Sequence, residues 1–214
     1  MKAILYKQFH LVCHPMTLVF PLFGVMLLIP SYPYTVIFFY VMLGLFFSFI
    51  NGREQKDIYY SALLPIRKRD TVKASVVFVL LIELASLLIA IPFALLSVRL
   101  NPLGGNAVGL EPNAALFAAA LLLYALFNGI FLPAFYKTAY QVGMSFLKAV
   151  IPASIVMIVC ELLPHVPSLA WLEDCTPVGQ LRLLPLVLCA AGIYGVGMWL
   201  TYQKAANNYE KVDL

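Results

Sequence analysis

The chain has 214 residues, of which 63% are apolar and only 11% are charged, and its formal net charge is +4. Soluble domains carry about a quarter charged residues, and a soluble fold of this composition would expose large apolar patches that soluble monomers avoid. The composition therefore excludes an ordinary soluble protein and predicts an integral membrane protein. Nucleic-acid binding is not predicted, because the basic residues flank apolar segments and form no concentrated basic face.

Six apolar segments are candidates for membrane spans, each of which needs about 20 residues as a helix. Their apolar runs are continuous, whereas the strands of a membrane barrel would alternate. The predicted fold class is an all-α integral membrane protein, with one transmembrane domain over residues 1–214. The spans are predicted at about 16–29, 34–50, 74–98, 114–135, 146–163 and 183–202.

The segment before the first span can form an amphipathic helix. One face of that helix is apolar and consists of Ile4, Leu5, Phe9 and Val12. We predict that it lies along the cytoplasmic leaflet, and a frayed tail is the alternative. The first two spans are short and are separated only by residues 31–33, so a re-entrant pair of helices stays open as an alternative to two crossings.

Residues 51–73 form a polar island between the second and third predicted spans. This island holds six of the 14 basic residues, namely Arg53, Lys56, Arg67, Lys68, Arg69 and Lys73. A simple connector needs only a few residues. Because proline favours the first turn of a helix, Pro65 predicts a short helix at about 65–69. The island either fixes the topology and touches anionic lipid, or it binds a soluble partner.

The distribution of basic residues predicts the orientation in the membrane. If the N-terminus is cytoplasmic, twelve of the 14 Lys and Arg residues lie inside, and only Arg99 and Arg182 lie outside. The positive-inside rule then places both termini in the cytoplasm of a multi-pass protein of the cell membrane. The loop 161–182 would lie outside, with Trp171 as an anchor in the outer interface.

Two polar residues lie inside predicted spans. Glu83 is the one acid in the middle of a span, where a charge is expensive and usually faces a partner, a cavity or a path. It either lines a translocation path or a subunit interface, or it is protonated or hydrogen-bonded to a neighbouring helix. Asn128 favours close helix packing. The four cysteines and three histidines have no metal-ligand spacing, and no catalytic, cofactor or metal site is predicted.

Two segments resemble a known family of membrane proteins. The N-terminus reads MKAILYKQF, and residues 61–74 read SALLPIRKRDTVKA, which is a Ser-x-x-Leu-Pro-hydrophobic-basic-basic element. The chain resembles a permease of the ABC type-2 transporter superfamily, in its compact subgroup of about six spans. The resemblance implies a cytoplasmic coupling helix between spans 2 and 3. The residues that it implies for docking of an ATPase are Leu64, Pro65, Ile66, Arg67, Lys68, Arg69 and Asp70.

The same resemblance implies the partners of the chain. The sequence contains no GxxxxGK[ST] phosphate-binding loop, so the chain is not expected to be an enzyme. ATP and Mg²⁺ are expected on a separate P-loop ATPase subunit, and a second permease copy, identical or related, would complete an exporter in the lipid bilayer. The alternatives are an intramembrane enzyme and a non-transporting assembly or sensor protein.

Overall fold

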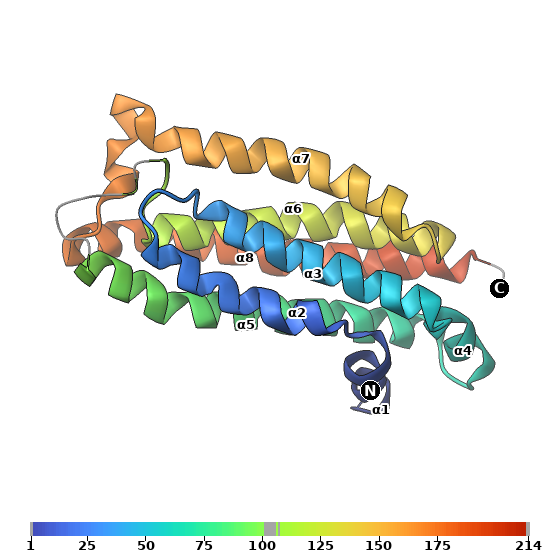
Figure 1. Ribbon diagram of the computed structural model, residues 1–214. Coiled ribbons are helices and arrows are strands. Elements are labelled where there is room, and N and C mark those ends of the chain that lie inside the picture. The colour runs from blue at the N-terminus through green and yellow to red at the C-terminus, as the bar shows by residue number, and fades with distance from the viewer. Residues whose placement is uncertain (1, 101–105, 107, 213–214) are drawn as a thin grey trace.

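The computed structural model describes residues 2–100, 106 and 108–212, and these form a bundle of long helices (Figure 1). Within this described part, five helices are long and apolar enough to cross a membrane, and a bent helix pair raises the number to six if it counts as one span. The predicted all-α membrane fold with about six spans is confirmed. The five are α3 (Thr35–Glu54), α5 (Lys68–Leu100), α6 (Ala114–Thr138), α7 (Val142–Leu162) and α8 (Pro177–Glu210).

The bent pair forms the N-terminal part of the bundle. Its first arm is α1 (Lys2–Lys7) with the π-helical turn η1 (Gln8–Val12), and its second arm is α2 (Pro15–Val19) with the 3₁₀ helix η2 (Phe20–Leu28). The two arms meet at 104°. The backbone of His14 is extended there (φ −81°, ψ 143°), as expected for a residue before proline.

The second arm spans a long distance with few residues. A 3₁₀ helix rises about 2.0 Å per residue and an α-helix about 1.5 Å, so Pro15–Leu28 extends over about 25 Å. An α-helix of the same length would reach only about 21 Å. The 3₁₀ winding therefore brings this short segment close to the thickness of the hydrocarbon core, about 30 Å.

The core of the bundle is built around α6. Aromatic side chains of this helix stack against one another and against α3: the ring centroids of Phe127 and Phe131 are 5.1 Å apart, and those of Phe49 and Phe131 are 5.0 Å apart. Phe131 and Phe127 are fully buried. Such van der Waals packing drives helix association in lipid, where burial of apolar surface gives little gain.

Helices α5 and α8 extend beyond the predicted apolar spans. They contain 33 and 34 residues, and each is about 50 Å long, whereas the hydrocarbon core is about 30 Å thick. Figure 1 shows the start of α5 and the last turns of α8 at the same end of the bundle as α1 and α4 (Asp57–Leu63). We call this the α4 end. It holds most of the predicted docking residues.

The opposite end is closed by two short 3₁₀ helices, η3 (Leu163–His165) and η4 (Pro167–Glu173), before α8 begins. Trp171 in η4 is half exposed. Buried polar contacts hold this end together. Asn113 caps the start of α6 and donates from Nδ2 to the Leu172 carbonyl at 2.6 Å.

Candidate functional site

The predicted docking segment takes a different local structure from the one expected. Lys56 adopts a left-handed conformation (φ 52°) that ends α3, and the short helix α4 follows at Asp57–Leu63. Leu64 is extended (ψ 150°), because the residue before a proline avoids the helical region. The helix predicted at about 65–69 is therefore wrong: the short helix precedes Pro65, and Lys68 already belongs to α5.

Solvent reaches most of the predicted docking residues. Leu64, Pro65, Arg67 and Arg69 are exposed, and three others are partly buried, namely Ile66, Lys68 and Asp70. The side chains of α4 add an apolar and aromatic surface next to them. We call this the α4 surface, and it consists of Tyr59, Tyr60, Leu63, Leu64 and Pro65.

Two of the predicted docking cations bind the chain's own C-terminal helix. The Arg69 guanidinium donates from Nε to Glu210 Oε1 at 2.7 Å and from its terminal nitrogen to Glu210 Oε2 at 3.1 Å. Lys68 Nζ donates to the Val212 carbonyl at 2.6 Å. These contacts join the start of α5 to the end of α8. Lys68 and Arg69 therefore have an internal role, whereas Arg67 is exposed and its guanidinium has no hydrogen bond or ion pair with another described residue.

Lys7 connects the N-terminal helix to α4. Its ammonium forms an ion pair with Asp57 and donates to Ser61 Oγ, and the side chains of Lys7 and Asp57 are only 14% and 8% exposed. Beside it, Gln8 Nε2 donates to Ser75 Oγ in α5 at 3.1 Å. The sequence analysis did not single out Lys7, because its partner is 50 residues away and no motif links them.

This ion pair gives a first prediction. Lys7→Met leaves the buried Asp57 carboxylate without its cation, and it should lower the free energy of unfolding in mixed micelles by about 2 kcal/mol. Adding Asp57→Asn to Lys7→Met should recover part of that loss, because the uncompensated charge disappears. Lys2→Met, on the exposed first turn of α1, is the matched control. Equal stability of Lys7→Met and Lys2→Met would contradict the proposed contact.

Glu83 and Asn128 meet in the interior of the bundle. Asn128 Nδ2 in α6 lies 2.8 Å from Glu83 Oε1 and 2.9 Å from Oε2. Tyr194 in α8 donates its hydroxyl to Glu83 Oε2 at 2.7 Å. Glu83 and Asn128 are both fully buried. The two residues predicted from the sequence are therefore neighbours, and the structure adds Tyr194 as a third member.

We call Glu83, Asn128 and Tyr194 the interior cluster, and the surroundings of Glu83 show what this cluster can do. Among the described residues no Lys, Arg or His forms an ion pair with Glu83, so its hydrogen bonds come from neutral groups. Asn128 Oδ1 is buried without a hydrogen-bond partner, and it can accept a bond from a protonated Glu83 after rotation of the amide. The cluster joins α5, α6 and α8 by polar contacts that would be costly to leave unsatisfied in a membrane.

Glu161, which the sequence analysis placed only as the first residue of an outer loop, is a second buried carboxylate. Its Oε1 accepts from the Thr35 backbone N–H at 2.8 Å and from Thr35 Oγ1 at 2.6 Å, and Oε2 accepts from Leu110 N–H at 2.9 Å. The sequence signal that could have identified this buried carboxylate is an acidic residue in the last turn of an apolar span. Elsewhere in the described chain, no three His, Cys, Asp or Glu side chains lie close enough to hold a metal ion.

The whole described bundle corresponds to one protein family. A family model for an ABC-2 family transporter protein matches residues 3–210, from α1 to the last residue of α8. Comparisons with curated proteins and with solved structures give no match. The family match covers the α4 end and the interior cluster alike, and it confirms the resemblance seen in the sequence. This chain therefore belongs to the ABC-2 family of transporter proteins, as a multi-pass membrane permease of an ABC transporter.

Proposed function

We propose that this chain is the permease subunit of an ABC exporter, and that it docks a separate P-loop ATPase through the α4 surface. The observation that carries the proposal is the exposure of apolar and aromatic side chains on α4, between two membrane helices and beside the chain's basic residues. Exposed apolar patches of this kind are typical of protein–protein contacts. The partner ATPase would bind ATP and Mg²⁺, and export is proposed from the family resemblance.

The contacts at the α4 end support a way for movement of the docked ATPase to be transmitted to the membrane helices. Lys7 links α4 to α1, and Arg69 links the start of α5 to Glu210 at the end of α8. A displacement of α4 by the ATPase would act on α1 through Lys7 and on α5 through the short connection at residues 64–67, and the Arg69–Glu210 ion pair would move α8 with α5. These helices meet again at Glu83 and Tyr194, so the interior cluster is the proposed point where they rearrange along the translocation path.

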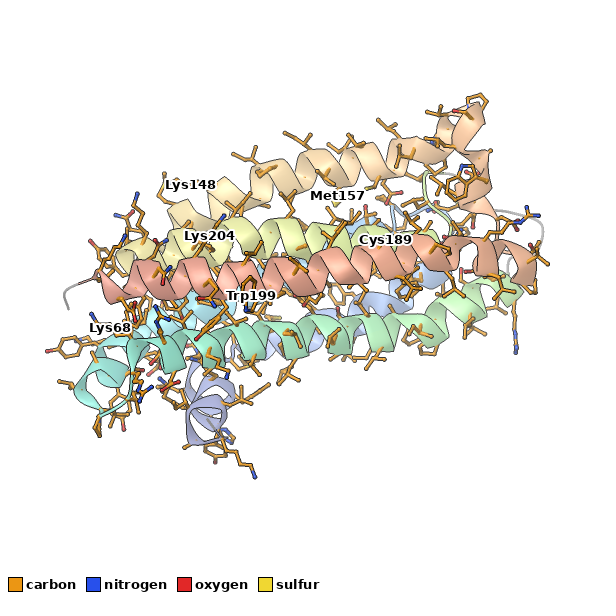
Figure 2. The ribbon with its side chains drawn as sticks, turned by 180° about the vertical axis from the view of Figure 1, so that it is seen from behind. Lys68, Lys148, Met157, Cys189, Trp199 and Lys204 are labelled. Carbon is orange, nitrogen blue, oxygen red and sulfur yellow. The ribbon has the colours of Figure 1, made fainter. Side chains whose placement is uncertain are left out.

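The proposed orientation places the α4 end in the cytoplasm of a cell-membrane protein. With both termini inside, twelve of the 14 basic residues are cytoplasmic, as the positive-inside rule requires. Figure 2 shows Lys68, Lys148 and Lys204 in the half of the bundle that contains α4. A second permease copy, identical or related, is proposed to complete the membrane part of the transporter.

Leu63 provides the sharpest test of docking. This side chain is 72% exposed, so Leu63→Ser should leave the fold intact. Loss of its burial against the ATPase should weaken binding by about tenfold or more, and it should reduce permease-stimulated ATP hydrolysis. The measurement is titration of the purified ATPase onto the permease in nanodiscs.

A matched control distinguishes loss of a docking contact from the general effect of removing an exposed apolar side chain. Tyr6 in α1 is 64% exposed but lies outside the α4 surface, and Tyr6→Ser should bind the ATPase like the unmodified chain. Unchanged ATPase binding by Leu63→Ser would rule out the α4 surface as the docking site.

A further inference from the structure

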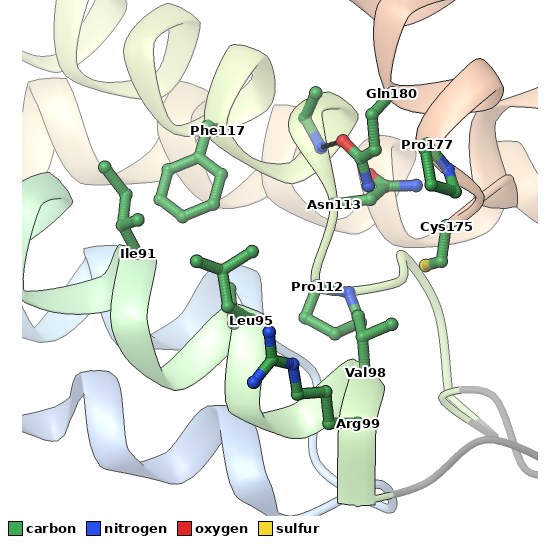
Figure 3. A pocket seen from close by; sticks show the side chains of 12 residues that line it. Ile91, Leu95, Val98, Arg99, Pro112, Asn113, Phe117, Cys175, Pro177 and Gln180 are labelled. Atoms are coloured by element: carbon green, nitrogen blue, oxygen red, sulfur yellow. Dashed lines mark hydrogen bonds between the residues drawn. The ribbon is translucent and has the colours of Figure 1, made fainter.

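A cavity of about 470 Å³ lies at the end of the bundle opposite α4. It is formed between α5, α6 and the start of α8 (Figure 3). Its size falls within the range of ligand pockets, roughly 300–1,000 Å³. The apolar part of its lining includes Ile91, Leu95, Val98, Phe117 and Pro177. None of the residues discussed for ATPase docking contributes to it.

The polar side chains of the lining are mostly occupied by structural bonds. Gln180 Oε1 accepts from the Ala114 N–H at 2.9 Å, and both polar ends of the Asn113 amide hold helix α6 and the Leu172 carbonyl. Burial, with a smaller effect of nearby carboxylates, raises the pKa of Cys175 to about 12. The Cys175 thiol is therefore neutral at physiological pH, and most of the cavity wall is uncharged.

Arg99 supplies the one formal charge among the residues that line the cavity. It is exposed, and no hydrogen bond or ion pair from another described residue occupies its guanidinium. A guanidinium presents a planar set of donors that matches the oxygens of a phosphate.

The order of residues along α5 matches the order of groups in a lipid leaflet. Ile91, Leu95 and Arg99 are spaced four residues apart and therefore form one stripe of the helix. This stripe is about 12 Å long, and the arginine is at the end of α5. Leu95 is 64% exposed, so the cavity is open on the side where α5 faces the bilayer.

We propose that this cavity binds one acyl chain of a membrane phospholipid whose phosphate is held by Arg99. The apolar wall contacts the acyl chain, and the Arg99 guanidinium binds the phosphate. Along the α5 stripe, the apolar residues lie toward the bilayer interior and Arg99 lies toward its surface, in the same order as the acyl chain and the phosphate of the lipid. This site is independent of the α4 surface. It would hold α5, α6 and α8 together at the end where no docking contact is proposed.

The test uses the full chain in nanodiscs with a phosphatidylglycerol probe that carries a photoactivatable diazirine in its acyl chain. Sites of labelling are mapped by mass spectrometry, with and without excess unlabelled phosphatidylglycerol. Leu95→Trp fills the cavity, and Leu88→Trp is its control because Leu88 lies on the same helix, is 68% exposed and does not line the cavity. Arg99→Gln removes the cation, and Arg182→Gln is its control at the same end.

Saturable labelling of residues 91–99 and 112–117 is expected in the unmodified chain and in both controls. It should fall by about tenfold in Arg99→Gln and comparably in Leu95→Trp. A diazirine-bearing fatty alcohol, which lacks phosphate, should be insensitive to Arg99→Gln. Equal labelling of all variants, or labelling that unlabelled lipid does not displace, would overturn the site. An equal Arg99 effect with the alcohol would overturn phosphate recognition.

Discussion

Replacement of Glu161 by alanine is expected to destabilise the folded chain by about 3 kcal/mol. The carboxylate accepts two hydrogen bonds from Thr35 at the first turn of α3 and one from the Leu110 N–H. Alanine would leave all three buried donors without their acceptor. It would also remove a negative charge from the N-terminus of α3, where the helix dipole favours one. The measurement is reversible unfolding in mixed micelles, followed by circular dichroism.

Gly109 provides an independent test of the same contact. A Cβ atom at this position would overlap the Glu161 carboxylate, so Gly109→Ala must displace either the loop or the carboxylate. We expect Gly109→Ala to lower the free energy of unfolding. The same substitution should lower it much less in a chain that already carries Glu161→Ala. Gly143→Ala, where the added Cβ meets nothing within 4 Å, is the control. Additive losses in the double variant would contradict the model of this contact.

Asn128→Leu is expected to destabilise the bundle by about 2 kcal/mol and to reduce coupling to the ATPase. The substitution removes the amide that donates to both oxygens of Glu83, and it leaves Tyr194 as the remaining side-chain donor. A buried carboxyl that loses a partner in the membrane costs more than an apolar side chain in the same place. Unfolding in micelles and permease-stimulated ATP hydrolysis measure the two effects.

Two further variants distinguish the effect of the Glu83–Asn128 hydrogen bonds from the effect of the ionisable group of Glu83. Glu83→Gln keeps hydrogen-bonding capacity without an ionisable group, and it should cost less than about 1 kcal/mol. Glu83→Leu combined with Asn128→Leu removes both polar groups, and it should be more stable than Asn128→Leu alone. If the double variant is the less stable one, the cluster stabilises the helices in some other way than by pairing Glu83 with Asn128.

The docking segment shows where local sequence rules stop being sufficient. Pro65 pointed to a helix start, and such a start is common for proline. The structure instead uses Leu64 and Pro65 to separate α4 from α5, because Lys56 ends α3 in a left-handed conformation and allows a short helix to form earlier. The ion pair of Lys7 with Asp57 then holds α4 against α1, and no local pattern reveals that contact. ATPase docking by residues 64–70 stays a prediction.

The interior cluster was predictable in part. Glu83 and Asn128 stood out because polar residues inside apolar spans are rare and costly, but their mutual contact was not predicted. It depends on the rotation of α5 and α6 about their axes, which their nearly all-apolar faces leave undetermined. Tyr194 gave no signal at all, since tyrosines are common throughout this chain.

The order of amino acids is enough to predict the membrane class and the helical fold with about six spans, because these follow from long apolar runs, and the local motif at residues 61–74 points to the family. The predicted orientation likewise depends only on the order of charges along the chain. Three features could be read only from the folded bundle: which carboxylates are buried, which cations bind the chain's own C-terminal helix, and which surface of α4 remains exposed. These features depend on contacts between residues 50 to 141 positions apart, and such contacts are set by helix packing.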